Sequence, residues 1–354
     1  MTSTFVYSGL VAAVALASAA AVAPVRAQGC EPIRFTTPVG LGGKGEAYQR
    51  EQQWRFTLAY RRLFSNEFYI GSSQSTAFFP NGKAPVFNIN TFVGDIAYAP
   101  SDRLLLHLSV PVQTGSESVI RADGQIHAQS VSGIGDVSVI AETWLFAPKT
   151  HDRGNISLGL GFKAPTGSHT SPSTDWTSTG ATVPVTAPWT ILPGDGGWAI
   201  LPSVQAFRQL GKYAYLYANG SYMVSPKAHS DALDPLSPPG VHLSVPDSYS
   251  MSAGASFSVL PEQGLSVSLG GRMDGTPLRD LIGGGDDVTG KRTFQVEFVD
   301  PGATWSRGKD SFTLSVPLRV HVNRFASLLD RKLERPGAGG FAKYLVFASY
   351  WHRL

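Results

Sequence analysis

Apolar side chains recur at every second position along much of this chain. Between residues 312 and 320 the apolar positions are Phe312, Leu314, Val316, Leu318 and Val320, and the residues between them are polar or proline. Side chains of a strand point alternately to its two faces, so each such run predicts a strand with one apolar and one polar face. The runs 156–163 and 248–259 alternate in the same way, with small Ser and Gly residues on the polar face. Small polar faces suit a wet lumen and large apolar faces suit lipid, which is the pattern of a transmembrane β-barrel.

The alternation predicts about twelve strands, an even number as in bacterial barrels. Their expected ranges are 52–63, 86–99, 102–112, 134–146, 154–165, 197–208, 212–224, 247–260, 263–273, 293–306, 310–322 and 341–352. Tight connections, rich in turn residues, alternate with long ones at 64–85, 113–133, 166–196, 225–246, 274–292 and 323–340. With both termini in the periplasm, every tight turn is periplasmic and every long loop is extracellular. The expected fold is therefore all-β, an antiparallel up-and-down transmembrane barrel.

The N-terminus carries the one continuous apolar run, at 10–22. Val25-Arg26-Ala27 follow it, which predicts a signal peptide over 1–27 with cleavage before Gln28. An uncleaved anchor is the alternative, because no Lys or Arg precedes the run. Residues 28–50 then form a periplasmic segment or enter the lumen as a plug, and 51–354 form the barrel. This organisation predicts the bacterial cell outer membrane as location, with its lipid and its assembly machinery as partners.

Composition narrows the class of protein. Mean hydropathy is -0.03 because polar lumen residues and apolar lipid residues cancel along each strand. Removing residues 1–27 removes one Arg from 29 basic residues, against 26 acidic ones, and the basic groups are scattered. No nucleic-acid partner is expected from this distribution. Cys30 is the only cysteine, so an intramolecular disulfide is excluded; its position near the cleavage site leaves lipidation as an alternative.

The alternation also assigns charged residues to the inner face of the barrel, since a charge facing mid-membrane lipid costs about 2–4 kcal/mol. These lumen candidates are Arg55, Arg61, His107, Glu142, Lys163, Arg272, Glu297, Arg319 and His321. They form either a ring that selects permeants by sign or a salt-bridged network that fills a narrow lumen. Asp136 has two interpretations as well: it binds a cation at the pore entrance, or it accepts hydrogen bonds from the backbone of its turn.

Four aromatic residues, Trp176, Trp189, Trp198 and Phe207, lie in or beside the longest loop. Flat apolar rings suit aromatic ligands, so these residues are candidate ligand contacts. The alternative is that they anchor the barrel at the membrane interface, a common position for Trp.

Three segments carry a resemblance to a known group of proteins. They are 133–138, which runs into Trp144-Leu145-Phe146; 158–167, which ends in Pro165-Thr166-Gly167; and 275–284, followed later by Pro301-Gly302. In these segments the chain resembles the outer-membrane family of meta-pathway phenol-degradation proteins. The resemblance implies uptake of aromatic or other small hydrophobic compounds, and it implies no catalytic residues.

The sequence offers little support for a catalytic, phosphate-binding or metal-binding function. There is no G-x-S-x-G strand–helix element for a hydrolase, and Gly283-Gly284-Gly285 is not followed by a Lys-Ser/Thr as in a phosphate loop. His229, Asp231, Asp234 and His242 lack the close spacing of a structural metal site, which favours a solvated loop. We therefore expect a non-enzymatic channel or diffusion pathway for small hydrophobic or aromatic solutes, with no cofactor and no metal. The alternatives are a non-transporting structural or surface-binding barrel and an outer-membrane hydrolase.

Overall fold

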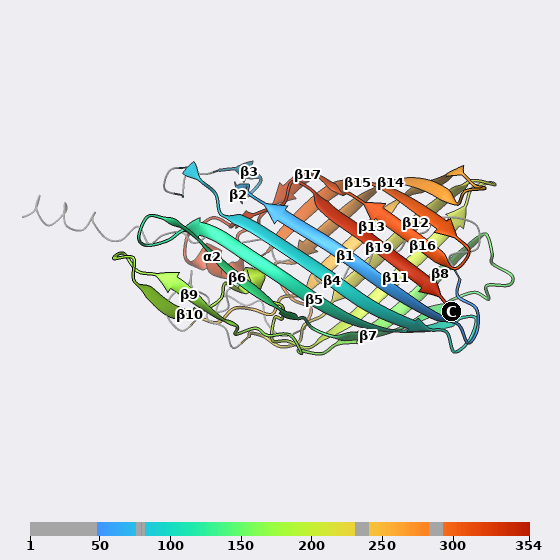
Figure 1. Cartoon of the computed structure of the whole chain (residues 1–354), viewed down its shortest axis with the longest axis horizontal. Helices are drawn as coiled ribbons and strands as arrows, with labels where there is room; N and C mark the ends of the chain where they lie inside the picture. Colours follow the sequence, from blue (N-terminus) through green and yellow to red (C-terminus); the bar gives the residue numbers. More distant parts are fainter. Residues whose placement is uncertain (1–47, 76–78, 80–81, 231–240, 283–292) are drawn as a thin grey trace, which may run out of the picture.

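The computed structural model describes residues 48–75, 79, 82–230, 241–282 and 293–354. Their strands form one closed antiparallel β-barrel with twelve strand positions, as the sequence predicts (Figure 1). The signal peptide, Cys30 and most of 28–50 lie outside the described residues, so the predictions about them stay predictions. Among the described residues, no helix is long and apolar enough to cross a membrane.

Two of the twelve strand positions hold a broken strand, β6–β7 and β16–β17. In chain order the barrel strands are β1 (Trp54–Ser65), β4 (Val86–Tyr98), β5 (Leu104–Ile120), β6 (Ile126–Ile134) with β7 (Ser138–Trp144), β8 (Gly154–Lys163), β11 (Ala199–Gln209), β12 (Ala214–Met223), β13 (Ser248–Leu260), β14 (Leu265–Thr276), β15 (Phe294–Arg307), β16 (Asp310–Ser315) with β17 (Leu318–Asn323), and β19 (Leu345–Arg353). β1 pairs with β19, from Arg55–Arg353 to Leu63–Leu345, and this pairing closes the barrel.

Each break has a local cause. Opposite β5, three residues of the β6–β7 strand, 135–137, face only two, so the strand bulges there. Beyond this bulge β6 pairs with β5 alone, because β8 ends at Lys163, opposite Ser138. In the second broken strand, Pro317 has no N–H to contribute to the ladder.

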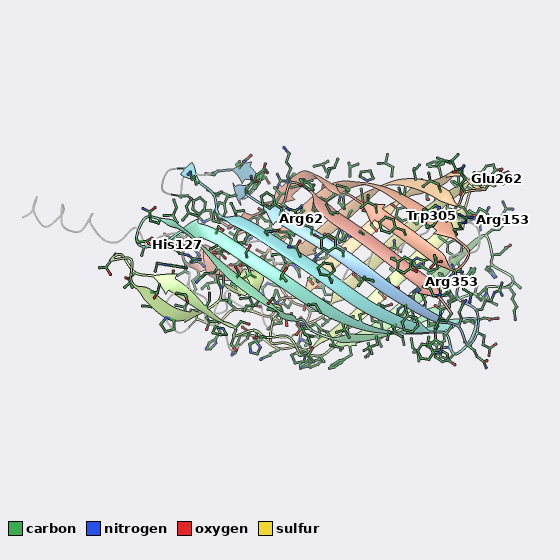
Figure 2. All side chains as sticks on the ribbon, in the orientation of Figure 1. Arg62, His127, Arg153, Glu262, Trp305 and Arg353 are labelled. Carbon is green, nitrogen blue, oxygen red and sulfur yellow. The ribbon has the colours of Figure 1, made fainter. Side chains whose placement is uncertain are left out.

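The two ends of the barrel differ as expected from the loop lengths. The short turns and the C-terminus lie at one end, where Figure 2 labels Arg153, Glu262 and Arg353, and His127 lies at the opposite end. The long connections carry the remaining elements. These are β2 (Phe68–Ile70), β3 (Ser73–Gln74), β9 (Pro172–Trp176), β10 (Thr182–Thr186), the 3-10 helix η2 (Trp189–Ile191), α2 (Leu328–Lys332) and β18 (Ala338–Gly340). By the topology of such barrels the short-turn end is periplasmic and the long-loop end is extracellular.

The outer face of the barrel is apolar over its middle. Leu58, Leu160, Leu269 and Leu314 are among the large hydrophobic side chains that are 40–62% exposed, and each alternates with a buried or half-buried neighbour. Trp305 also points outward from the wall (Figure 2). Such a band is favourable only in contact with lipid.

The inner face does not follow the prediction of a uniformly small and polar lumen. In the periplasmic half it is polar, with Ser268, Thr304 and Thr313 facing inward. In the extracellular half the inward side chains are large and apolar, and they form the main core of the molecule. This apolar cluster contains Leu63, Phe68, Tyr69, Phe79, Phe87, Ile89, Phe294, Val296, Phe298, Val322, Ala338, Phe341, Ala342, Leu345 and Phe347. The prediction was wrong for this half because extracellular segments fold against the wall and need apolar partners there.

Candidate functional site

The periplasmic half of the lumen encloses a cavity of about 290 Å³. Its wall comes from most of the barrel strands and from Gln49, which precedes β1 and is buried. Hydroxyl groups dominate the wall, interrupted by aromatic side chains such as Trp144, Phe347 and Trp351. A cavity of this size, apolar in part and with convergent polar groups, is the form of a small-molecule site.

One side of this cavity carries a group of charged side chains from four neighbouring strands. His107 lies between two carboxylates, with its Nδ1 3.3 Å from Asp95 and its Nε2 3.8 Å from Glu142. Arg55 on β1 lines the same region and forms no ion pair within 4 Å among the described residues. The predicted lumen residues Arg55, His107 and Glu142 are therefore brought together here.

The opposite side of the cavity is built by β13 to β16. The Nε of Arg272 donates to Asp274 over 2.9 Å, and its guanidinium lies 4.8 Å from the centre of the Phe347 ring. Asp300 accepts a hydrogen bond from Ser315. Arg272 is thus inward, as predicted, and has a carboxylate partner.

Above the cavity, the apolar cluster fills the extracellular half of the lumen. Phe68 and Phe341, from two extracellular segments, are essentially fully buried against inward side chains of β1, β4, β15 and β19. Arg319 on β17 binds both segments to the wall. It pairs with Glu67 and donates a hydrogen bond to the Tyr69 hydroxyl over 2.6 Å. It also donates to the Phe341 carbonyl over 3.0 Å. Burial alone would raise the pKa of Glu67, but the hydrogen bond and charge of Arg319 outweigh it and hold that pKa below its ordinary value.

A second segment, 164–197, closes the lumen from the side of β5. The Gln113 side chain donates to the carbonyls of Ile191 and Leu192 over 3.2 and 2.9 Å, and Thr190 donates to Glu117 over 3.0 Å. A Cβ placed on Gly115 would lie 2.8 Å from the Ile191 carbonyl oxygen, so only glycine permits this approach.

Lys163, Asp136 and Asp195 hold the same segment at the bulge between β6 and β7. Lys163 has no exposed surface, its Nζ lies 3.3 Å from Asp136 and it also pairs with Asp195. Asp136 further accepts hydrogen bonds from the backbone N–H groups of Gly167 and Asp195. Asp136 therefore accepts backbone hydrogen bonds, but from the 164–197 segment and not from its own turn as its turn interpretation predicts, and Lys163 is an inward, ion-paired residue.

The remaining predicted lumen residues divide into two groups. Arg61 is buried and its guanidinium donates to Thr91 over 3.4 Å. Glu297 and His321 lie on the outer face, where their side chains are 41% and 50% exposed and 3.8 Å apart. Their inward assignment was wrong for two reasons. The inward positions at this height belong to the apolar cluster, and a register shift beside Glu297 changes the face of the following residues of β17.

The four candidate aromatic residues do not form one site. Trp176 stacks on His127 at 4.0 Å in the extracellular loops, and Trp189 packs against the Ile191 region of η2. Trp198 is 39% exposed and stacks with outward Phe162, which is the position of an interface anchor. Phe207 is buried near the periplasmic end, where it contacts Tyr48 and Trp144.

Sequence reasoning missed Asp95, Asp300 and Gln49. The alternation along 86–99 places Asp95 inward, so that signal was present. Along 293–306, Glu297 and Asp300 point to opposite faces, so assigning Glu297 inward left Asp300 on the outer face. No periodic signal marks Gln49, which precedes the first strand. In the described part of the chain, no group of three or more His, Cys, Asp or Glu residues is arranged to hold a metal ion. Asp231 and Asp234 lie outside the described residues.

Comparison with known proteins confirms the fold. No protein-family model and no curated protein matches this sequence. Among solved structures, the chain is similar to an outer membrane channel from Pseudomonas putida F1, with a TM-score of 0.60 and 15% identity over 88% of this chain and 98% of that one. Weaker likenesses include a Pseudomonas aeruginosa FadL homologue (TM-score 0.40, 11% identity, 85% and 90% covered) and the P. putida toluene transporter TodX (TM-score 0.41, 9% identity, 86% and 91% covered). The chain is a β-barrel protein of the bacterial outer membrane.

Proposed function

We propose that the protein is a passive diffusion channel for small hydrophobic or aromatic solutes. The observation that carries this proposal is the apolar interior of the extracellular half, which lies above a cavity in the barrel. General porins have a polar, water-filled interior. Rings such as Phe87, Phe294 and Phe298 favour an apolar or aromatic solute instead. The resemblance of 133–138 and 158–167 to the meta-pathway family supports the same class of solute, and the fold likeness to an outer membrane channel supports passage through the barrel.

Passage requires the packed segments to move. Phe68 and Phe341 fill the lumen from one side, and 187–195 fills it from the β5 side. This filling is also the observation that favours a second candidate, a barrel that does not transport. In the channel, a solute enters between the segments and the apolar wall, reaches the cavity and leaves toward the periplasm down its gradient, so no cofactor is needed.

Uptake of radiolabelled toluene by cells with and without the protein tests the proposal, with glucose as a polar solute for comparison. The lipopolysaccharide leaflet of intact cells slows apolar solutes, so a channel should raise the initial rate of toluene entry severalfold and leave glucose entry unchanged. An unchanged toluene rate in cells that hold correctly folded barrel would favour the non-transporting alternative.

A reversible cross-link tests whether 187–195 must move. A Cβ placed on Gly133 lies 3.9 Å from the Cβ of Pro193, which matches a disulfide. Gly133→Cys/Pro193→Cys, in a Cys30→Ser background, should lose toluene uptake when oxidised and regain it on reduction. Each single cysteine variant is the control. Equal uptake in both redox states would show that solutes pass without displacing this segment.

A further inference from the structure

The cavity has an excess of negative charge that becomes clear once its ion pairs are assigned. At the periplasmic rim, Asp102 pairs with Lys149 at 3.0 Å. Arg103, also at the rim, donates to the backbone carbonyls of Trp144 and Leu145. Deeper in the wall, Arg272 is neutralised by Asp274. The Asp102–Lys149 and Arg272–Asp274 pairs therefore contribute little net charge to the cavity interior, whereas Arg103 keeps its positive charge because backbone carbonyls are neutral.

Three carboxylates remain, and none of them has a Lys or Arg within 4 Å among the described residues. Each accepts a hydrogen bond from a serine of the neighbouring strand. The pairs are Asp95 with Ser109, Glu142 with Ser157, and Asp300 with Ser315. A hydroxyl stabilises a carboxylate but does not neutralise it.

Arg55 and Arg103 are the two cations in the described wall that are left to oppose these three carboxylates. Counting Lys, Arg, Asp and Glu, the interior therefore carries a formal surplus of one negative charge. In a confined and partly desolvated space such a surplus acts strongly on a mobile charge and is weakly screened by salt.

Two hydrogen-bond acceptors at the cavity lack partners among the described residues, beside two nitrogens, Arg55 Nε and His107 Nε2. The Gln49 side chain is 8% exposed, and its Oε1 has no hydrogen-bond partner among the described residues. Asn219 Oδ1 also has no partner among these residues. Both residues line the cavity. An ammonium group offers three donors and no acceptor, so it matches both the charge and the unpaired oxygens.

The aromatic side chains of the wall fit the rest of such a solute. Trp144, Tyr217, Phe347 and Trp351 all line the cavity. The guanidinium groups of Arg272 and Arg353 already lie over the rings of Phe347 and Trp351, so the rings of Trp144 and Tyr217 are left to attract a cation. All four rings can pack against an aromatic ring. We infer that the cavity prefers aromatic solutes that carry a cationic amine, such as arylalkylammonium ions, over their neutral and carboxylate analogues. This inference rests on the proposed function, because it selects among aromatic solutes that reach the same cavity.

Three ligands that share a benzyl or phenyl ring test the preference. Equilibrium dialysis of the detergent-solubilised barrel measures the Kd of benzylammonium, benzyl alcohol and benzoate. Benzylammonium should bind about tenfold more tightly than benzyl alcohol, and benzoate should bind most weakly. Benzoate binding as tightly as benzylammonium would overturn the inference.

Two matched substitutions identify the charge that matters. Glu142→Gln removes one cavity carboxylate and keeps its size, whereas Glu297→Gln makes the same change on the outer face. Glu142→Gln should weaken benzylammonium binding severalfold without weakening benzyl alcohol binding. Glu297→Gln should change the binding of neither ligand. Equal effects of both would contradict the cavity as the origin of the preference. Asp300→Asn provides the same test if Glu142→Gln does not fold.

The outcomes separate this inference from the proposed function. If benzyl alcohol binds and toluene uptake occurs without any preference for the cation, the preference alone is wrong. If none of the three ligands binds and toluene uptake is absent, both fail. A reversal potential measured in a KCl gradient gives an independent reading: it should show cation preference that falls in Glu142→Gln and not in Glu297→Gln, and anion preference in the unchanged protein would contradict the inference.

Discussion

Replacing Lys163 with Met tests how the segment 164–197 is held in the lumen. Met keeps most of the side-chain volume but leaves the buried carboxylates of Asp136 and Asp195 without their shared cation. Removing one partner of a buried ion pair costs about 3–5 kcal/mol. Lys163 has no exposed surface, so solvent does not reduce this cost. The cost falls on the docked state, because undocking exposes both carboxylates to water. Each 1.4 kcal/mol is a factor of ten, so the undocked fraction should rise roughly 10²- to 4 × 10³-fold.

Chymotrypsin added to the folded barrel measures this fraction, because Trp189 is a cleavage site that the docked segment half-buries. When opening is fast, the cleavage rate follows the open population. Lys149→Met is the control, since Lys149 is 84% exposed in its pair with Asp102 and such pairs contribute only about 0–1 kcal/mol. Cleavage of Lys163→Met at the rate of the control, with both barrels intact by heat modifiability, would refute the reasoning.

Three further substitutions test which side chains face lipid, how closely η2 approaches β5, and how the docking of β2 depends on pH. Leu314→Arg should destabilise the barrel by the roughly 2–4 kcal/mol that a lipid-facing Arg costs, measured by urea unfolding in lipid. Leu281→Arg, at an exposed loop residue, should not destabilise the barrel. Equal effects of the two substitutions would contradict the lipid-facing assignment of Leu314. Gly115→Ala should push η2 away from β5 and raise chymotrypsin cleavage, whereas Gly220→Ala, where a Cβ has a closest neighbour at 3.4 Å, should leave it unchanged. Because the pKa of Glu67 is lowered in the folded protein, its stabilising effect is present above its unfolded pKa of about 4.3 and is lost as pH falls through the folded value. Acid should therefore release β2 in the unchanged protein. In Glu67→Gln, where β2 is already released, acid should cause little further change.

Strand number and topology could be predicted because they depend on local alternation. Each of the twelve expected ranges overlaps one strand position, although β5 and β6 extend through most of 113–133, which was expected to be a loop. Leu314 and Thr313 lie on the faces that period two assigns to them. The same rule places Arg55, His107 and Glu142 at one cavity. Where the wall is regular and one face meets lipid, the cost of a misplaced charge makes the pattern reliable.

The pattern failed where tertiary packing replaces lipid and water as the environment. Glu297 was assigned inward because a charge was expected to avoid lipid, but near the extracellular rim its outward side chain is 41% exposed. Val296 and Phe298 occupy the inner face instead, because Phe341 and its neighbours pack there. The docking of distant segments leaves no periodic signal in a strand, so neither the filled lumen nor the partner of Lys163 could be derived from alternation.

The pairing of β1 with β19 also determines how the barrel can assemble. These strands lie almost 300 residues apart in the chain, and closing a loop of that length costs about 5 kcal/mol by the (3/2)RT ln n estimate. Until the last strand arrives, β1 and the strand that awaits β19 both present unpaired backbone groups, each of which costs several kcal/mol in hydrocarbon. A nascent barrel therefore gains little from partial insertion. Its incomplete forms expose two unpaired strand edges, which can pair with neighbouring chains. Protection of those edges during biogenesis is a kinetic requirement that the finished, edgeless molecule no longer reveals.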